Sequence, residues 1–138
     1  MMRNNDQNDI TVQSVGTIVS AKMAVDFVKR ICSASYTGII TALRLNAKSE
    51  CIGYTHNRTD LDLAYTLGTV HDAVNEKGCV GIILVYDKEE GLMPTDKEIY
   101  VFDDLHRKLA ALQISLIDVI TMHGKEAYSF AEERIIQK

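Results

Sequence analysis

The sequence predicts an α/β domain in which helices flank a mixed β-sheet. Segments with the three-and-four apolar spacing of amphipathic helices alternate with short apolar runs typical of strands. Their order is helix, two strands, helix, strand, helix, two strands. The chain has 138 residues, which suits one domain, and its 46% hydrophobic and 25% charged residues are ordinary globular values. We therefore expect residues 10–138 to form one domain, preceded by a flexible tail of residues 1–9.

The N-terminal part of the domain is expected to contain one helix. Ile10–Val15 is either a short strand or an extended lead-in. Ser20 is a suitable N-cap for a helix that continues to about Cys32. The apolar residues of this segment recur on one helical face, which should be buried: Ala24, Phe27, Val28 and Ile31.

A hairpin and a second helix follow. Gly38–Asn46 and Glu50–His56 are expected to be two strands, because the residues between them have turn chemistry. A polar loop, Asn57–Asp60, leads to a helix that Gly78 should end. Four apolar residues mark this helix: Leu63, Leu67, Val70 and Val74.

The C-terminal half begins with a strand that should be buried on both faces, Cys79–Tyr86, since its apolar run is nearly continuous. After a charged loop and Pro94, Thr95 and Glu98 have the spacing of a capping box. That helix should reach about Leu112 and bury Phe102, Leu105, Leu109 and Leu112. Two further strands are expected at Ile114–Met122 and Ala127–Phe130.

Charge and motif content narrow the function classes. The net charge of −4 disfavours nucleic acid as a partner, because phosphate neutralisation needs a basic surface. The four histidines lack metal-ligand spacing, and no phosphate-binding loop or serine-hydrolase elbow occurs.

No apolar run reaches the roughly 20 residues of a membrane span, and the N-terminus lacks a signal-peptide pattern, so we expect a cytoplasmic protein. The three cysteines (Cys32, Cys51 and Cys79) are expected to be reduced core thiols, with a reactive thiol or a spatial pair as alternatives.

The densest polar segment is Tyr86–Gly91, at the carboxyl end of the predicted buried strand. This position commonly holds binding or catalytic sites in α/β proteins. A solvated turn is the alternative interpretation. Glu98 likewise has a structural alternative, because it can serve as the acid of the capping box.

Several short motifs follow this strand in a fixed order. After the strand come Gly91, Pro94-Thr95-Asp96-Lys97-Glu98, Asp118-Val119-Ile120 and Tyr128-Ser129-Phe130-Ala131-Glu132. Upstream, Asn57-Arg58-Thr59-Asp60 looks like the Asn-Arg-Thr-Glu of plasmid and prophage proteins. Together, over about Ser20–Ile136, the chain resembles the RadC-like branch of the JAB/MPN (JAMM) metalloprotein family. The resemblance implies a JAB/MPN-like, cytidine-deaminase-like three-layer architecture.

The chain departs from that family at its active site. The two zinc-binding histidines of the family motif correspond to Tyr86 and Lys88, and its Pro-Ser to Glu89-Glu90. The third ligand, an aspartate, corresponds to Glu98. The segment Tyr36–Ile40, where the family carries its glutamate base, has no carboxylate. Because that mechanism needs both zinc and a base, the resemblance implies the fold without a catalytic residue, metal or cofactor.

We therefore expect a catalytically inactive RadC-like JAB domain that acts as a protein-binding module, such as a phage or plasmid accessory or anti-defence protein. Its partner would be a protein of basic character, and a homo-oligomer is compatible with the sequence. The alternatives are a DNA-associated repair-type protein and an enzyme with a non-standard site. The expected binding surface is the former active-site loop with the acid that follows it: Tyr86, Asp87, Lys88, Glu89, Glu90, Leu92, Met93 and Glu98.

Overall fold

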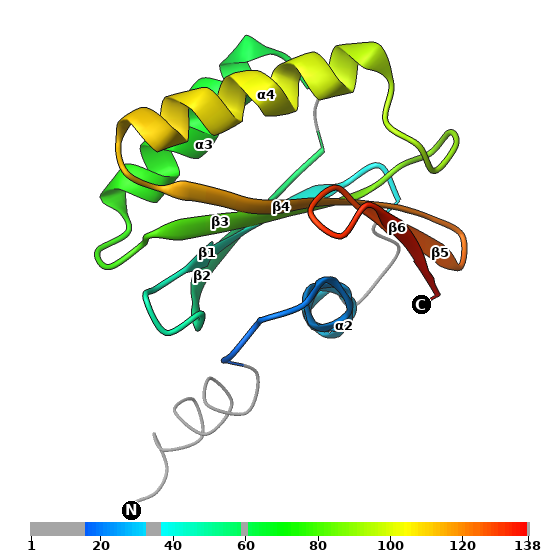
Figure 1. Ribbon diagram of the computed structural model, residues 1–138, viewed down its shortest axis with the longest axis horizontal. Coiled ribbons are helices and arrows are strands. Elements are labelled where there is room, and N and C mark those ends of the chain that lie inside the picture. The colour runs from blue at the N-terminus through cyan, green and yellow to red at the C-terminus, as the bar shows by residue number, and fades with distance from the viewer. Residues whose placement is uncertain (1–15, 33–36, 59–60, 138) are drawn as a thin grey trace, which may run out of the picture.

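The structure is a computed structural model that describes residues 16–32, 37–58 and 61–137. The expected tail, the lead-in Ile10–Val15 and part of the loop Asn57–Asp60 lie outside these residues. The predicted mixed α/β class is confirmed. A six-stranded sheet with strand order β2-β1-β3-β4-β5-β6 carries helices α3 and α4 on one face and helix α2 on the other (Figure 1).

The sheet is mixed because one of its strand pairs is parallel. Strands β1 (Ile40–Leu45) and β2 (Cys51–Asn57) form the predicted hairpin, and β1 also pairs antiparallel with β3 (Gly81–Asp87). Strand β3 runs parallel to β4 (Ser115–His123), so the chain crosses between them through a helix. Strands β5 (Glu126–Ser129) and β6 (Arg134–Gln137) complete the sheet in antiparallel fashion. Strand β6 was not predicted from the sequence.

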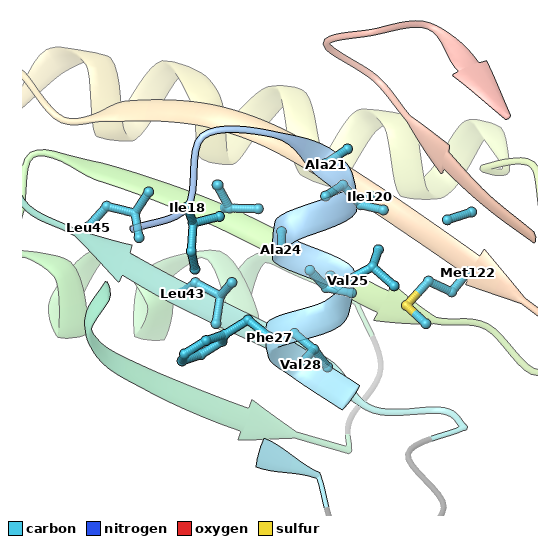
Figure 2. Close-up of a cluster of buried hydrophobic side chains, with 13 residues drawn as sticks. Ile18, Ala21, Ala24, Val25, Phe27, Val28, Leu43, Leu45, Ile120 and Met122 are labelled. Carbon is cyan, nitrogen blue, oxygen red and sulfur yellow. The ribbon is translucent and has the colours of Figure 1, made fainter. Parts of the chain in front are cut away.

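Helix α2 (Ala21–Ile31) confirms the first predicted helix and its cap. The Ser20 hydroxyl oxygen accepts a hydrogen bond from the Met23 backbone N–H over 3.1 Å. The buried side chains of α2 pack onto one face of the sheet, against Leu43, Leu45, Ile120 and Met122 (Figure 2). As predicted, Ala24, Phe27 and Val28 are buried and Ile31 packs against this cluster.

Helix α4 (Asp96–Ala111) is the crossover between the two parallel strands. It buries Phe102, Leu105 and Leu109 against the other face of the sheet, as predicted. Leu112 was expected on the same face, and this prediction is wrong. Leu112 is the C-cap, where the backbone leaves helical geometry, and its side chain is exposed.

Helix α3 (Leu63–Asn75) confirms the second predicted helix but not the face that its apolar residues suggest. Leu63, Leu67 and Val74 are exposed, and the side chain of Leu67 is 60% exposed. The buried face of α3 instead carries Tyr65, Thr66, Thr69 and Ala73. The helix also ends at Asn75, before the predicted stop at Gly78. Of the four apolar residues that mark the helix in the sequence, only Val70 packs against this core, so packing against α4 and the sheet buries a smaller and more polar face.

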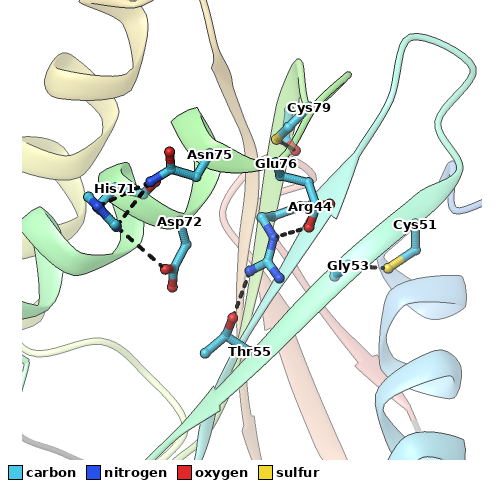
Figure 3. A network of polar contacts seen from close by, with 10 residues as sticks. Arg44, Cys51, Gly53, Thr55, His71, Asp72, Asn75, Glu76 and Cys79 are labelled. Atoms are coloured by element: carbon cyan, nitrogen blue, oxygen red, sulfur yellow. Dashed lines mark hydrogen bonds and ion pairs between the residues drawn. The ribbon is translucent and has the colours of Figure 1, made fainter.

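A polar network ties the end of α3 to the hairpin on the sheet's edge (Figure 3). The Arg44 guanidinium donates to the Glu76 carboxylate over 2.9 Å and to the Thr55 hydroxyl over 2.7 Å. This ion pair lies directly over Gly53. A Cβ atom at Gly53 would stand 2.1 Å from the Glu76 carboxylate oxygen, so a larger residue there would displace the Glu76 side chain.

Candidate functional site

The carboxyl ends of the two parallel strands β3 and β4 lie side by side, and the polar segment predicted to follow β3 begins there. The Lys88 N–H donates to the Met122 carbonyl over 2.8 Å, which joins the end of β3 to the end of β4. On the other side of β3, Gly38 N–H donates to the Asp87 carbonyl over 2.6 Å. The loop of residues 88–95 therefore leaves the sheet at the position where α/β folds commonly place a site.

Lys88 points into the protein from this loop. Its side chain is 4% exposed, and its ammonium group donates to the Glu98 carboxylate over 2.6 Å and to the Met93 carbonyl over 2.7 Å. Glu98 is itself only 14% exposed. The two charges thus form a buried ion pair between the loop and the start of α4. Lys88 was expected on the binding surface, and in this arrangement it cannot face a partner.

Glu98 is the acid of a complete capping box, as predicted. Its carboxylate accepts from the Thr95 backbone N–H over 2.9 Å, while the Thr95 hydroxyl accepts from the Glu98 N–H over 3.1 Å. The carboxylate oxygen that accepts from Thr95 is the one that pairs with Lys88. The position near the helix N-terminus adds a further favourable interaction with the helix dipole.

The donor atoms at this position do not fit a zinc ion. Of the three residues that the resemblance aligns with zinc ligands, Tyr86 is half-buried against the core under α4, Lys88 is an ammonium donor, and Glu98 is already paired with it. A protonated lysine repels a metal cation, and zinc sites need three or four N, S or O ligands. Within the described residues, no three His, Cys, Asp or Glu side chains come together in a group able to hold a metal ion.

A carboxylate from another part of the chain lies near the segment where the family carries its base. Tyr36 lies outside the described residues, and Gly38, Ile39 and Ile40 have no carboxylate of their own. However, the loop brings Glu89 to this strand. A Cβ atom built at Gly38 would lie 3.4 Å from the carboxyl carbon of Glu89. A carboxylate is thus present near the strand, although it comes from a different part of the sequence.

The outer surface of the 88–95 loop carries two acidic side chains and one exposed apolar side chain. Glu89 and Glu90 are exposed, Met93 is 52% exposed, and Leu92 is half-buried. Asp87 was expected on this surface but is buried. Of the expected binding residues, Glu89, Glu90 and Met93 therefore present most of the area that a partner could reach.

A thiol and an imidazole also meet near this end of the sheet, a pair that sequence reasoning missed because 24 positions separate the two residues. The Cys32 sulfur lies 3.9 Å from both ring nitrogens of His56, and His56 Nδ1 lies 2.9 Å from the Thr41 hydroxyl. Burial, followed by the negative charge of Asp87, raises the pKa of the Cys32 thiol. A raised pKa favours the thiol over the more nucleophilic thiolate.

Comparison with known proteins adds no family. The chain matches no protein-family model and no curated protein sequence. In the part of the chain that the structure describes, no helix is long and apolar enough to cross a membrane.

Proposed function

We propose that this protein is a non-catalytic, RadC-like JAB/MPN module that binds another protein, and that a buried lysine–glutamate pair stands where active relatives hold zinc. The observation that carries the proposal is the Lys88–Glu98 pair, with 2.6 Å between ammonium and carboxylate. Lys88 and Glu98 are two of the positions that the resemblance aligns with metal ligands. Their mutual pairing leaves no ligand set for a metal and supplies a structural role in its place.

The arrangement of the sheet supports the same interpretation. Helices cover both faces, which fits the three-layer architecture that the resemblance implies. In this proposal, the parallel strands β3 and β4 and the capped helix α4 would correspond to the family's metal-site strand, its closing strand and its ligand-bearing helix. The phage, plasmid or anti-defence setting rests on the resemblance alone and is part of this proposal.

The exposed acids of the loop define the partner's chemistry. Glu89 and Glu90 stand together at its surface beside Met93, so the loop offers two negative charges and an apolar contact. Complementary charge would accelerate association with a basic protein and make the association rate sensitive to salt. The same charges would repel a phosphate backbone, which disfavours nucleic acid at this face.

Partner capture followed by charge reversal tests the proposal. Proteins retained from a host lysate by the immobilised full chain are identified, and association rates are measured at low salt for the wild type and for Glu89→Lys with Glu90→Lys. The matched control is Asp26→Lys with Asp72→Lys, which changes the net charge equally on helices α2 and α3. We expect the loop variant to associate at least tenfold more slowly and the control to match the wild type. Equal rates for both variants would exclude the loop as the recognition surface.

A further inference from the structure

The N-terminal half of strand β4 has an open edge. Strand β5 pairs with β4 only from Ile120 to His123, and the last backbone bond between the two segments runs from the Phe130 N–H to the Val119 carbonyl over 3.0 Å. Beyond it, among the described residues, no strand pairs with 115–118 on this side (Figure 1). An unpaired strand edge exposes backbone donors and acceptors to which another extended chain can bind.

Two cavities flank this edge, one on each face of the sheet. The first, of about 320 Å³, lies on the α4 side, with Ile99 and Phe102 in its wall. The second, of about 340 Å³, lies on the α2 side, with Ser20 and Ala21 in its wall. Both are lined by Ile117, Asp118 and Ala131, so they meet at the open edge itself. Successive side chains of an added strand point to opposite faces of the sheet and would enter the two cavities alternately.

The two cavities differ in chemistry. The wall of the α4-side cavity is apolar at Phe102, Leu116, Val119 and Phe130. Asp103 and His106 of α4 also line this cavity, but Asp103 already forms an ion pair with Arg107 on the same helix. The α2-side cavity has two carboxylates, Asp118 and Glu132. No lysine or arginine is among the described residues that line either one. Charge complementarity therefore favours a strand with apolar side chains on one face and basic side chains on the other.

Asp118 is the central polar group of this edge. It is 8% exposed, and its two oxygens accept from the Ser129 hydroxyl over 2.5 Å and from the Ala131 N–H over 2.9 Å. Burial raises the pKa of this carboxyl above its ordinary value, an effect that these hydrogen bonds oppose only in part. A cation brought to the carboxylate would favour its charged form, so Asp118 gains from a basic ligand.

Strand β4 has a bulge close to Asp118, and this bulge affects which strands can pair with the open edge. The pairing of β3 with β4 shifts by one residue at Ile82/Ile83, which leaves Ile117 as an extra residue in β4. A bulge and an acid turned inward on an edge strand both discourage nonspecific strand pairing. An apolar strand would leave Asp118 without a cation, whereas a strand with lysine or arginine at the facing position would place one beside it.

We infer that the edge of β4 at residues 115–118 binds an extended peptide with alternating apolar and basic residues, as an added strand. This binding site is separate from the 88–95 loop, at the opposite end of β4. The inference does not depend on the proposed function, although both would serve a protein that works by binding others.

The test uses the full chain and a fluorescent peptide of about eight residues that alternates leucine and lysine, a length typical of one strand. Fluorescence anisotropy measures its affinity beside two controls: the same peptide with glutamate in place of lysine, and the leucine–lysine peptide with alternate backbone amides methylated. We expect each control to bind at least tenfold more weakly, because one loses the charge match and the other loses main-chain donors. Equal binding of either control would overturn the inference.

Mapping and a variant locate the site. Amide chemical shifts should change at 115–118 on peptide addition, and Asp118→Asn should weaken leucine–lysine peptide binding at least tenfold while thermal unfolding shows that the variant is folded. If Asp118→Asn does not fold, the shift map of the wild type decides alone. Shift changes confined to the 88–95 loop would contradict this site, and so would a concentration-dependent dimer that occupies the edge and excludes peptide. Failure of the peptide test leaves the charge-reversal result at Glu89 and Glu90 unaffected.

Discussion

Replacing Lys88 by methionine should destabilise the fold far more than a typical lysine substitution. Methionine retains most of the apolar stem but removes the charge-assisted bond to Glu98, worth about 1.5–3 kcal/mol, and the bond to the Met93 carbonyl, worth about 1 kcal/mol. Removing one member of a buried ion pair costs about 3–5 kcal/mol. Because Glu98 retains its bond from Thr95, we expect a loss near the lower end, about 3 kcal/mol.

The assay is urea unfolding followed by circular dichroism, with the free energy of unfolding extrapolated to water. Lys125→Met, at an exposed turn position, is the matched control and should change the free energy of unfolding by less than about 0.5 kcal/mol. Combining Lys88→Met with Glu98→Gln should restore part of the loss, since glutamine can serve in a capping box without a buried charge. A coupling energy of at least about 1 kcal/mol between the two sites is expected. Lys88→Met within about 0.5 kcal/mol of the wild type, or a double variant whose loss equals the sum of the single losses, would refute the reasoning.

Three further predictions concern the rest of the fold. Gly53→Ala should displace the Arg44–Glu76 ion pair and lower the free energy of unfolding by about 1–3 kcal/mol, and an unchanged urea midpoint would contradict the packing described here. Leu67→Gln, on the exposed face of α3, should change that free energy by less than about 0.5 kcal/mol, whereas a loss above about 2 kcal/mol would mean that this face is covered. The raised pKa of Asp118 means that its folded form binds a proton more readily than its unfolded form, so wild-type stability relative to Asp118→Asn should increase as pH falls from 7 through that raised pKa toward 3.8. Relative stability that falls over this range would show that the shift has the opposite sign.

Local signals in the sequence predicted most elements of the fold. The caps at Ser20 and Thr95 fix where two helices begin, because a side-chain oxygen satisfies a backbone donor that the helix leaves unpaired. The continuous apolar run of β3 indicated a strand buried on both faces, and the structure places it between β1 and β4. Each of these features depends on residues close together in the sequence.

The features that sequence reasoning missed depend on tertiary contacts. The buried face of α3 is decided by the space between α4 and the sheet, so the apolar residues that mark this helix in the sequence do not show which face is buried. The predicted cap role of Glu98 was correct. Its pairing with Lys88 was not foreseen, because ten positions separate the two and the loop must fold inward to join them. For the same reason, Lys88 and Asp87 were assigned to a surface that they do not reach.

The zinc content of the purified protein tests the central claim most directly. Elemental analysis of the wild type and of Tyr86→His with Lys88→His, both dialysed against zinc and then against buffer, measures bound metal per chain. We predict no stoichiometric zinc in the wild type, because Lys88 holds the carboxylate of Glu98. We predict increased zinc in the double variant, which supplies two imidazoles in place of Tyr86 and Lys88. One equivalent of zinc in the wild type that Glu98→Ala removes would contradict it.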